Sequence, residues 1–342
     1  MTRLIIDLQG CQVTEEEEEL LQEPLIGGVI LFKHNVQDPE QVQALTQQVR
    51  DINPQLIIVT DQEGGRVQRL QNGWTSLPPT RLLGRYYDHH PSSALDLAER
   101  WGWLLATEVL AVGVDLSLSP VLDVDYGISH VIGDRAFHSQ PEVVRQIAHR
   151  FILGMQQAGM MPVGKHFPGH GGVDIDSHQA IPTDDRPFAK LMYEDFIPFH
   201  YMIDQSIAAL MPGHIQFSQI DDQIVTFSET WLKSILRGEF NYRGLVISDD
   251  IMMGSAKISY PDPVERVQKA FQAGCDAVCL CHHRDVVWQV IDKLQTDGSL
   301  TANNPLASLK GRSKLDWYTL ADNPNWQQAQ YDIAQVHSLL DE

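Results

Sequence analysis

One short segment of the sequence, residues 165–178, carries several side chains that can hold or transfer protons. It reads KHFPGHGGVDIDSH and places His170, Asp174, Asp176 and His178 close together along the chain. An imidazole titrates near neutral pH, and a carboxylate beside it fixes its tautomer and raises its basicity. Such a pair can protonate a leaving group and later deprotonate water. We interpret the segment as a catalytic loop in which His170 and Asp174 are structural; the alternative is a polar surface loop with incidental histidines.

The residues around this loop predict its place in the fold. Apolar residues 160–163 are typical of a buried strand, and the proline and glycines that follow make the backbone leave the sheet without forming a helix. Similar apolar segments alternate with helical patterns along most of the chain. The eight predicted strands are 4–8, 27–32, 56–60, 114–124, 160–163, 208–211, 244–248 and 277–280.

This alternation predicts an α/β protein, a single-domain (β/α)8 TIM barrel, rather than an open doubly wound sheet. Residues from about 298 to 342 resume a helical pattern after a polar stretch. We expect them to form a short helical C-terminal extension packed on the barrel, so that residues 1–342 make one catalytic domain.

Polar residues cluster where the predicted strands end. Barrel enzymes place their active sites at the carboxyl ends of the strands, so these residues should meet on one rim although they lie far apart in sequence. Each charged residue could instead belong to an ion-pair network that ties the rim together. The residues are Asp61, Arg69, Arg135, Lys165, His166, His214, Asp249 and Asp250.

Composition restricts the possible functions. With 25 Lys and Arg against 45 Asp and Glu, the net charge of −20 argues against binding to nucleic acids or anionic membranes. No apolar run could span a bilayer and the N-terminus does not resemble a secretory signal, so we expect a cytoplasmic protein. Cys279 and Cys281 precede His282 and His283, but we interpret the cysteines as reduced core thiols rather than zinc ligands. We expect no metal or cofactor, and a monomer.

Four sequence blocks, in this order along the chain, resemble the family 3 glycoside hydrolases, and within them the single-domain bacterial β-N-acetylhexosaminidases of the NagZ type. One departure is the segment 251–256 (IMMGSA), where the family more often shows LSMEGA. The resemblance implies a barrel enzyme that removes terminal β-linked N-acetylglucosamine. The blocks are 61–69 (DQEGGRVQR), 133–137 (GDRAF), 165–171 (KHFPGHG) with 176–178 (DSH), and 248–250 (SDD).

The resemblance also implies a retaining, two-step mechanism. Asp249 would be the nucleophile that forms a covalent glycosyl-enzyme. His178 would be the general acid/base, and Asp176 would orient it. Because neighbouring residues of a strand face opposite sides, we expect only one of Asp249 and Asp250 to point inward. We choose Asp249 because it directly follows Ser248, as the nucleophile of the family does.

The remaining rim residues are assigned to the sugar by the same resemblance. Charged hydrogen bonds are strong, and leaving such groups unpaired is costly, so these residues could discriminate between sugars. We expect His214 to line the pocket as well. The implied substrate is a peptidoglycan fragment in which N-acetylglucosamine is attached to an anhydromuramyl peptide, in cell-wall recycling. The substrate-binding residues are Asp61, Arg69, Arg135, Lys165 and His166.

Further functions stay open from the sequence. The chain could be a β-glucosidase-like member of the same family, or a phosphorolytic glycosidase in which phosphate accepts the sugar. It could be a metal-dependent barrel hydrolase, with His166, His170, His178 and nearby aspartates as ligands. It could also be a barrel that binds sugar without catalysis.

Overall fold

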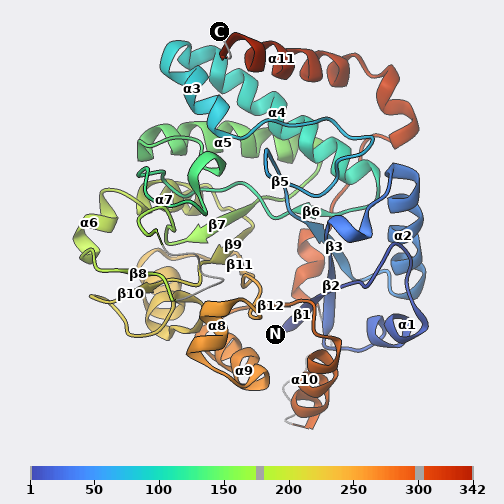
Figure 1. The fold of residues 1–342 in the computed structure, drawn as a ribbon, viewed down its shortest axis with the longest axis vertical. Helices are drawn as coiled ribbons and strands as arrows, with labels where there is room; N and C mark the ends of the chain where they lie inside the picture. Colours follow the sequence, from blue (N-terminus) through green and yellow to red (C-terminus); the bar gives the residue numbers. More distant parts are fainter. Residues whose placement is uncertain (1, 175–180, 297–303, 341–342) are drawn as a thin grey trace.

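Parallel strands surrounded by helices form the centre of the protein (Figure 1). The computed structural model describes residues 2–174, 181–296 and 304–340. Most strand residues are buried and apolar, as expected for strands covered on both faces. The eight barrel strands are β1 (Arg3–Asp7), β2 (Ile26–Leu31), β3 (Ile57–Thr60), β6 (Leu116–Ser117), β7 (Val163–Phe167), β9 (Ala209–Pro212), β11 (Leu245–Val246) and β12 (Ala277–Leu280).

Two parallel sheets close into the barrel. One has the strand order β12-β1-β2-β3-β6 and the other β11-β9-β7. Single bridges join them on both sides, between Val121 and Lys165 and between Ile247 and Ala277. The ring therefore has no free edge, and the predicted (β/α)8 barrel is confirmed.

Capping residues mark the ends of several outer helices. Thr14 and Glu17 form a capping box at the start of α1, and Asp38 caps α2 ahead of Pro39. Gly159 ends α5 in a left-handed conformation, with φ of 104°. The larger outer helices are α1 (Glu15–Leu21), α2 (Pro39–Ile52), α4 (Pro91–Ala111), α5 (Pro141–Ala158), α7 (Phe196–Asp204), the π-helical η4 (Thr230–Glu239), α9 (Pro263–Ala273) and α10 (Arg284–Thr296).

Two predicted elements differ in the structure. The helical pattern that ends near residue 112 predicts one long helix, but the structure has two, α3 (Arg81–His89) and α4, because His90 precedes Pro91 and leaves the helical region of backbone space. The apolar run 114–124 pairs over only two residues as β6. Pro120 lies in this run and has no N–H to donate to a neighbouring strand.

Short elements occupy the connections. Strands β4 (Gln62–Gly64) and β5 (Val67–Gln68) form an antiparallel hairpin directly after β3, and β8 (Thr183–Asp184) pairs with β10 (Gln216–Phe217). The hairpin carries part of the rim. The other short helices are η1 (Lys33–Asn35), η2 (Gly133–Arg135), α6 (Phe188–Met192), η3 (Val225–Phe227), α8 (Gly254–Ser259), η5 (Pro305–Leu309) and η6 (Trp317–Asp322).

Helix α11 (Pro324–Leu340) crosses α3 and α4 on the outside of the barrel (Figure 1). The indole Nε1–H of Trp326 donates to the buried Glu108 Oε1 of α4 at 2.8 Å, and Gln330 donates to Thr75 at 2.7 Å. These bonds fix the tail to the barrel wall. None of the described helices combines the length and apolarity that crossing a bilayer requires.

Candidate active site

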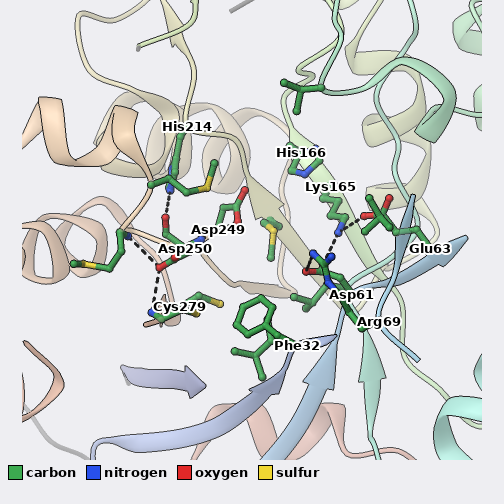
Figure 2. Close-up of a pocket in the computed structure, with 18 of the residues that line it drawn as sticks. Phe32, Asp61, Glu63, Arg69, Lys165, His166, His214, Asp249, Asp250 and Cys279 are labelled. Atoms are coloured by element: carbon green, nitrogen blue, oxygen red, sulfur yellow. Dashed lines mark hydrogen bonds and ion pairs between the residues drawn. The ribbon is translucent and has the colours of Figure 1, made fainter. Parts of the chain in front are cut away.

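A cavity of about 1480 Å³ opens at the carboxyl ends of the strands. Every described rim residue that the sequence singles out lines it, although these residues come from different strand ends (Figure 2). The proposed acid/base pair, Asp176 and His178, lies outside the described residues. The lining residues predicted from the sequence are Asp61, Arg69, Arg135, Lys165, His166, His214, Asp249 and Asp250.

One wall of the cavity is a buried ion cluster around Lys165 and Glu63. The Lys165 ammonium lies 2.9 Å from Asp61 Oδ1 and 2.6 Å from Glu63 Oε1. The Arg135 guanidinium binds Glu63 through two hydrogen bonds of 2.8 Å each. Burial alone would raise the pKa of Glu63, but Arg135 and Lys165 hold it well below its usual range. The cluster is therefore charged, and it keeps two cations in place at the cavity wall.

An ion pair also joins Asp61 and Arg69, at 3.4 Å. Asp61 thus joins Arg69 to Lys165, so these groups form an ion-pair network on the rim and line the cavity at the same time. Sequence reasoning missed Glu63, which lies in β4 two residues after Asp61. The sequence feature that could have indicated Glu63 is the presence of a second carboxylate in the block 61–69.

A second buried carboxylate, Asp123, holds His166. Asp123 is fully buried and accepts hydrogen bonds from the His166 ring Nδ1 at 2.7 Å and from the backbone N–H of His170 at 2.8 Å. Burial would raise its pKa, but His166 and His170 together lower it, so the carboxylate is ionised. With Nδ1 bound to Asp123, His166 presents Nε2 to the cavity. Sequence reasoning also missed Asp123. The feature that could have indicated it is a carboxylate within the otherwise apolar run 114–124.

Lys165 and His166 are neighbours in sequence, yet both line the cavity. Strict alternation along a strand would turn one of them away. The pairing of β7 with β9 shifts register between Lys165 and Phe167, which is a β-bulge-like irregularity. Such irregularities re-aim side chains near active sites.

We expect Asp123→Asn to lower kcat/KM by roughly 10- to 100-fold, because misplacing a group that contacts substrate is costly even when the altered residue lies behind it. Asparagine keeps the size but removes the charge that fixes the His166 ring. The expected loss is mainly in KM, and the ¹⁵N chemical shifts of the His166 ring should report a changed tautomer. An unchanged His166 spectrum with lost activity would contradict a positioning role.

Asp249 and Asp250 face different surroundings although they are adjacent (Figure 2). Asp250 Oδ1 accepts backbone N–H bonds from Met252 at 3.0 Å and from Cys281 at 3.2 Å. Asp249 Oδ1 accepts only the N–H of Asp250, at 2.8 Å, among the bonds between described residues. One carboxylate therefore supports the backbone, while the other is available to a ligand.

Electrostatics separates the two aspartates further. Burial would raise the pKa of Asp249, but His214, His166 and the N–H of Asp250 hold it below its ordinary value. Burial raises the pKa of Asp250 to about 7, and the Asp249 carboxylate acts in the same direction. Asp249 is the ionised carboxylate at neutral pH.

The expectation that only one of these aspartates faces the interior was wrong in its premise. Strand β11 ends at Val246, so strand alternation does not govern residues 249 and 250, and both line the cavity. His214 lines it too, as predicted. Its Nε2 lies 3.0 Å from the carbonyl oxygen of Asp250 and its Nδ1 lies 2.8 Å from Thr226 Oγ1.

His170 and Asp174, interpreted from sequence as loop structure, also line the cavity. His170 is buried and neither ring nitrogen has a hydrogen-bond partner in the described part of the chain. Burial and the neighbouring His166 lower the pKa of His170 to about 4, so the ring is neutral at physiological pH.

The cysteines near the cavity are free thiols, as predicted. Cys279 and Cys281 are buried and line the cavity, and burial raises the pKa of both well above the usual value. The two thiols are therefore protonated at neutral pH. Within residues 2–174, 181–296 and 304–340, no group of three or more His, Cys, Asp and Glu is arranged to hold a metal ion.

Comparison with known sequences identifies similar proteins along nearly the whole chain. Residues 3–308 match the profile of the glycosyl hydrolase family 3 N terminal domain. A β-hexosaminidase of Nitrosospira multiformis is 43% identical over 335 residues, covering 97% of this chain and 96% of the relative. A β-hexosaminidase of Thiobacillus denitrificans is 44% identical over 309 residues, covering 90% and 86% of the two chains.

Comparison with solved structures also identifies proteins that are similar over nearly the whole chain. The crystal structure of native NagZ from Neisseria gonorrhoeae superposes with a TM-score of 0.90 at 38% identity, covering 98% of this chain and 97% of the other. The same protein in complex with N-trifluoroacetyl-D-glucosamine gives a TM-score of 0.89 at 38% identity, with 98% of each chain covered.

Proposed function

We propose, from the premise that the chain belongs to glycosyl hydrolase family 3 and is a β-hexosaminidase, that it removes terminal β-linked N-acetylglucosamine from peptidoglycan fragments in the cytoplasm. The fragments would be N-acetylglucosaminyl-anhydromuramyl peptides, which places the enzyme in cell-wall recycling. Residues 1–342 would act as one catalytic unit, without a cofactor. The observation that carries the proposal is the ionised, available Asp249 facing a wall of charged hydrogen-bonding groups in one cavity.

The wall around Lys165 supports sugar binding. Asp61, Arg69, Arg135, Lys165 and His166 offer both donors and acceptors to hydroxyl groups. Bonds among them and to Glu63 and Asp123 hold them in position before a sugar arrives. Charged groups of fixed geometry bind hydroxyls strongly and penalise a sugar that leaves them unpaired. A complex of the N. gonorrhoeae relative with N-trifluoroacetyl-D-glucosamine supports an N-acylated glucosamine as the sugar.

The reaction would proceed by retention in two steps. Asp249 attacks the anomeric carbon, the bond to the leaving oxygen breaks, and a glycosyl-aspartate forms. His178, oriented by Asp176, gives its proton to the leaving oxygen, and in the second step it takes a proton from the water that attacks the same carbon. His214, His166 and Lys165 favour the ionised form of Asp249, so they would stabilise the carboxylate that is released in the second step.

The charge of the cavity mouth supports a substrate that carries carboxylates. The chain as a whole has a net charge of −20, yet the exposed cations Lys33 and Lys257 line the cavity. Such cations attract anionic substrates. The peptide stem of a muropeptide ends in carboxylates, whereas a chitin-type oligosaccharide is neutral.

The proposal is tested by comparing three substrates of the wild-type enzyme: a chromogenic N-acetylglucosaminide, the matched glucoside, and N-acetylglucosaminyl-anhydromuramyl peptide. We expect turnover of the first and third. Turnover of the glucoside alone would place the enzyme among the β-glucosidases. Turnover of the chromogenic N-acetylglucosaminide without the peptide fragment would retain the activity and overturn the physiological substrate.

The same assay tests for a metal-dependent hydrolase, a phosphorylase and a silent sugar-binding barrel. Activity that survives exhaustive chelation contradicts a metal-dependent hydrolase. Products analysed in phosphate buffer distinguish hydrolysis, which gives free N-acetylglucosamine, from phosphorolysis, which gives the sugar phosphate. Binding of sugar without any product would indicate a catalytically silent barrel.

His178→Ala is expected to lower kcat/KM by about 10²- to 10⁴-fold on a disaccharide, since its leaving alkoxide needs a proton. On a dinitrophenyl glycoside, His178→Ala should lower kcat/KM far less, because dinitrophenolate leaves without protonation. The exposed His89, outside the cavity at the end of α3, provides the control His89→Ala. An equal fall in kcat/KM on both substrates would contradict a role for His178 as the general acid.

A further inference from the structure

Three rings gather at the mouth of the cavity, where the loops after β2 and β12 lie on either side of β1. The ring of Phe32 lies 4.8 Å from that of His282 and 6.0 Å from that of His34, measured between centroids. His34 and His282 are 6.2 Å apart. All three line the cavity, and Figure 2 shows Phe32 below the open space beside Arg69. We call Phe32, His34 and His282 the ring platform.

Hydrogen bonds hold the ring platform in place. Asp7, which is 7% exposed, binds His282 twice: it accepts the backbone N–H at 3.0 Å and lies 3.2 Å from the ring Nδ1. His34 Nε2 lies 2.9 Å from the carbonyl oxygen of Leu8. The His282 backbone is left-handed, with φ of 64°, a conformation that non-glycine residues adopt rarely and mostly at functional sites.

The His282 side chain nevertheless remains 53% exposed. An ordered ring that is fixed at its base and open on its outer side is prepared to receive a ligand.

The ring platform continues directly from the proposed sugar-binding wall. The Arg69 guanidinium carbon lies 5.9 Å from the centre of the Phe32 ring, and the same guanidinium binds Asp61 at 3.4 Å. The platform also lies near the proposed nucleophile, because the N–H of Cys281, the neighbour of His282, donates to Asp250, which is next to Asp249. Farther along the rim, after β3 and β6, Arg66 is paired with Asp134, and His130 is 93% exposed without a stacked ring in the described part of the chain.

We infer that Phe32, His34 and His282 form a second subsite, which binds the sugar ring to which the departing N-acetylglucosamine is attached. A pyranose ring has one face of C–H groups, and this face packs on flat rings while the hydroxyls stay in water. Neither the ion cluster nor Asp249 offers such a surface. The inference rests on the proposed function and deepens it, because it states how the enzyme distinguishes a sugar leaving group from a small alcohol.

The test compares two substrates that share the N-acetylglucosamine and differ in what is attached to it. One is N-acetylglucosaminyl-anhydromuramic acid, whose leaving group is a sugar ring. The other is trifluoroethyl β-N-acetylglucosaminide, whose leaving group is small and has no ring. The measured quantity is the ratio of kcat/KM for the disaccharide to kcat/KM for the trifluoroethyl glycoside. A partly unfolded preparation loses both activities equally, so folding defects do not change the ratio.

Two ring-removing variants are matched with controls. His282→Asn removes the ring and keeps a residue that tolerates the left-handed backbone, and His34→Ala removes the second ring. His34→Phe keeps a ring at that position, and His89→Ala changes a histidine outside the cavity. We expect the ratio to fall by roughly three- to tenfold in His282→Asn and His34→Ala, the usual size of an aromatic stacking contribution. His34→Phe should restore it, and His89→Ala should not change it.

The outcomes separate the two proposals. If the wild type cleaves both substrates and the ratio is the same in all variants, the subsite is overturned and the proposed activity stands. Equal losses on both substrates would place the rings in the N-acetylglucosamine pocket and also overturn the subsite. If the wild type cleaves neither substrate, the proposed function fails.

Discussion

Replacing Asp249 by alanine is expected to lower kcat by about 10⁴-fold or more, the scale seen when a covalent nucleophile is removed. The physical reason is that Asp249 is ionised and available to a ligand, whereas the neighbouring carboxylates Asp250 and Glu63 are engaged by other groups. Asp250 is turned to the N–H groups of Met252 and Cys281, and burial raises its pKa to about 7. Glu63 is ionised but fully engaged by Arg135 and Lys165.

The matched control is Asp250→Asn, which keeps an acceptor oxygen for the two N–H groups and should retain activity within about tenfold. A slow fluorinated N-acetylglucosamine derivative then identifies the nucleophile directly. Intact-mass analysis should show one added sugar on the wild type and on Asp250→Asn, and none on Asp249→Ala. A labelled peptide in which Asp250 carries the sugar would reverse the assignment.

Replacing Glu63 by alanine is expected to lower the free energy of unfolding by about 3–5 kcal/mol, because it leaves Arg135 and Lys165 as buried cations without their common partner. The Arg135 and Lys165 side chains are only 10% and 3% exposed. The measurement is urea denaturation followed by tryptophan fluorescence. Activity should fall as well, since both cations line the proposed sugar-binding wall.

Asp134→Ala provides the comparison for Glu63. It breaks an ion pair with Arg66 at 3.1 Å in which both side chains are nearly half exposed, and exposed pairs contribute less than about 1 kcal/mol. A similar loss of stability in both variants would contradict a special role for the buried cluster.

Acidification gives a second signature of the Glu63 cluster. The folded pKa of Glu63 is lowered, so its contribution to stability is complete above the unfolded pKa of about 4.3. That contribution decreases as the pH falls from there toward the folded pKa. The difference in stability between wild type and Glu63→Ala should therefore shrink below about pH 4.

The barrel and most of its rim were predictable from the sequence because they rest on local patterns. Apolar segments that alternate with capped helices define eight strands, and the barrel rule places whatever follows each strand on one rim. This reasoning was enough to bring Asp61, Lys165, His214 and Asp249 to one cavity. The sequence blocks around them were enough to identify the family.

Only the tertiary structure decided which charges bind one another and which side chains stay available. Asp123 and Glu63 lie inside an apolar run and a short hairpin, and nothing local says that one holds His166 and the other holds Arg135. Asp249 and Asp250 are chemically identical in sequence. Both line the cavity, but packing against the residues after β12 turns Asp250 toward backbone N–H groups and leaves Asp249 available to a ligand, because a buried carboxylate must find donors wherever the fold supplies them.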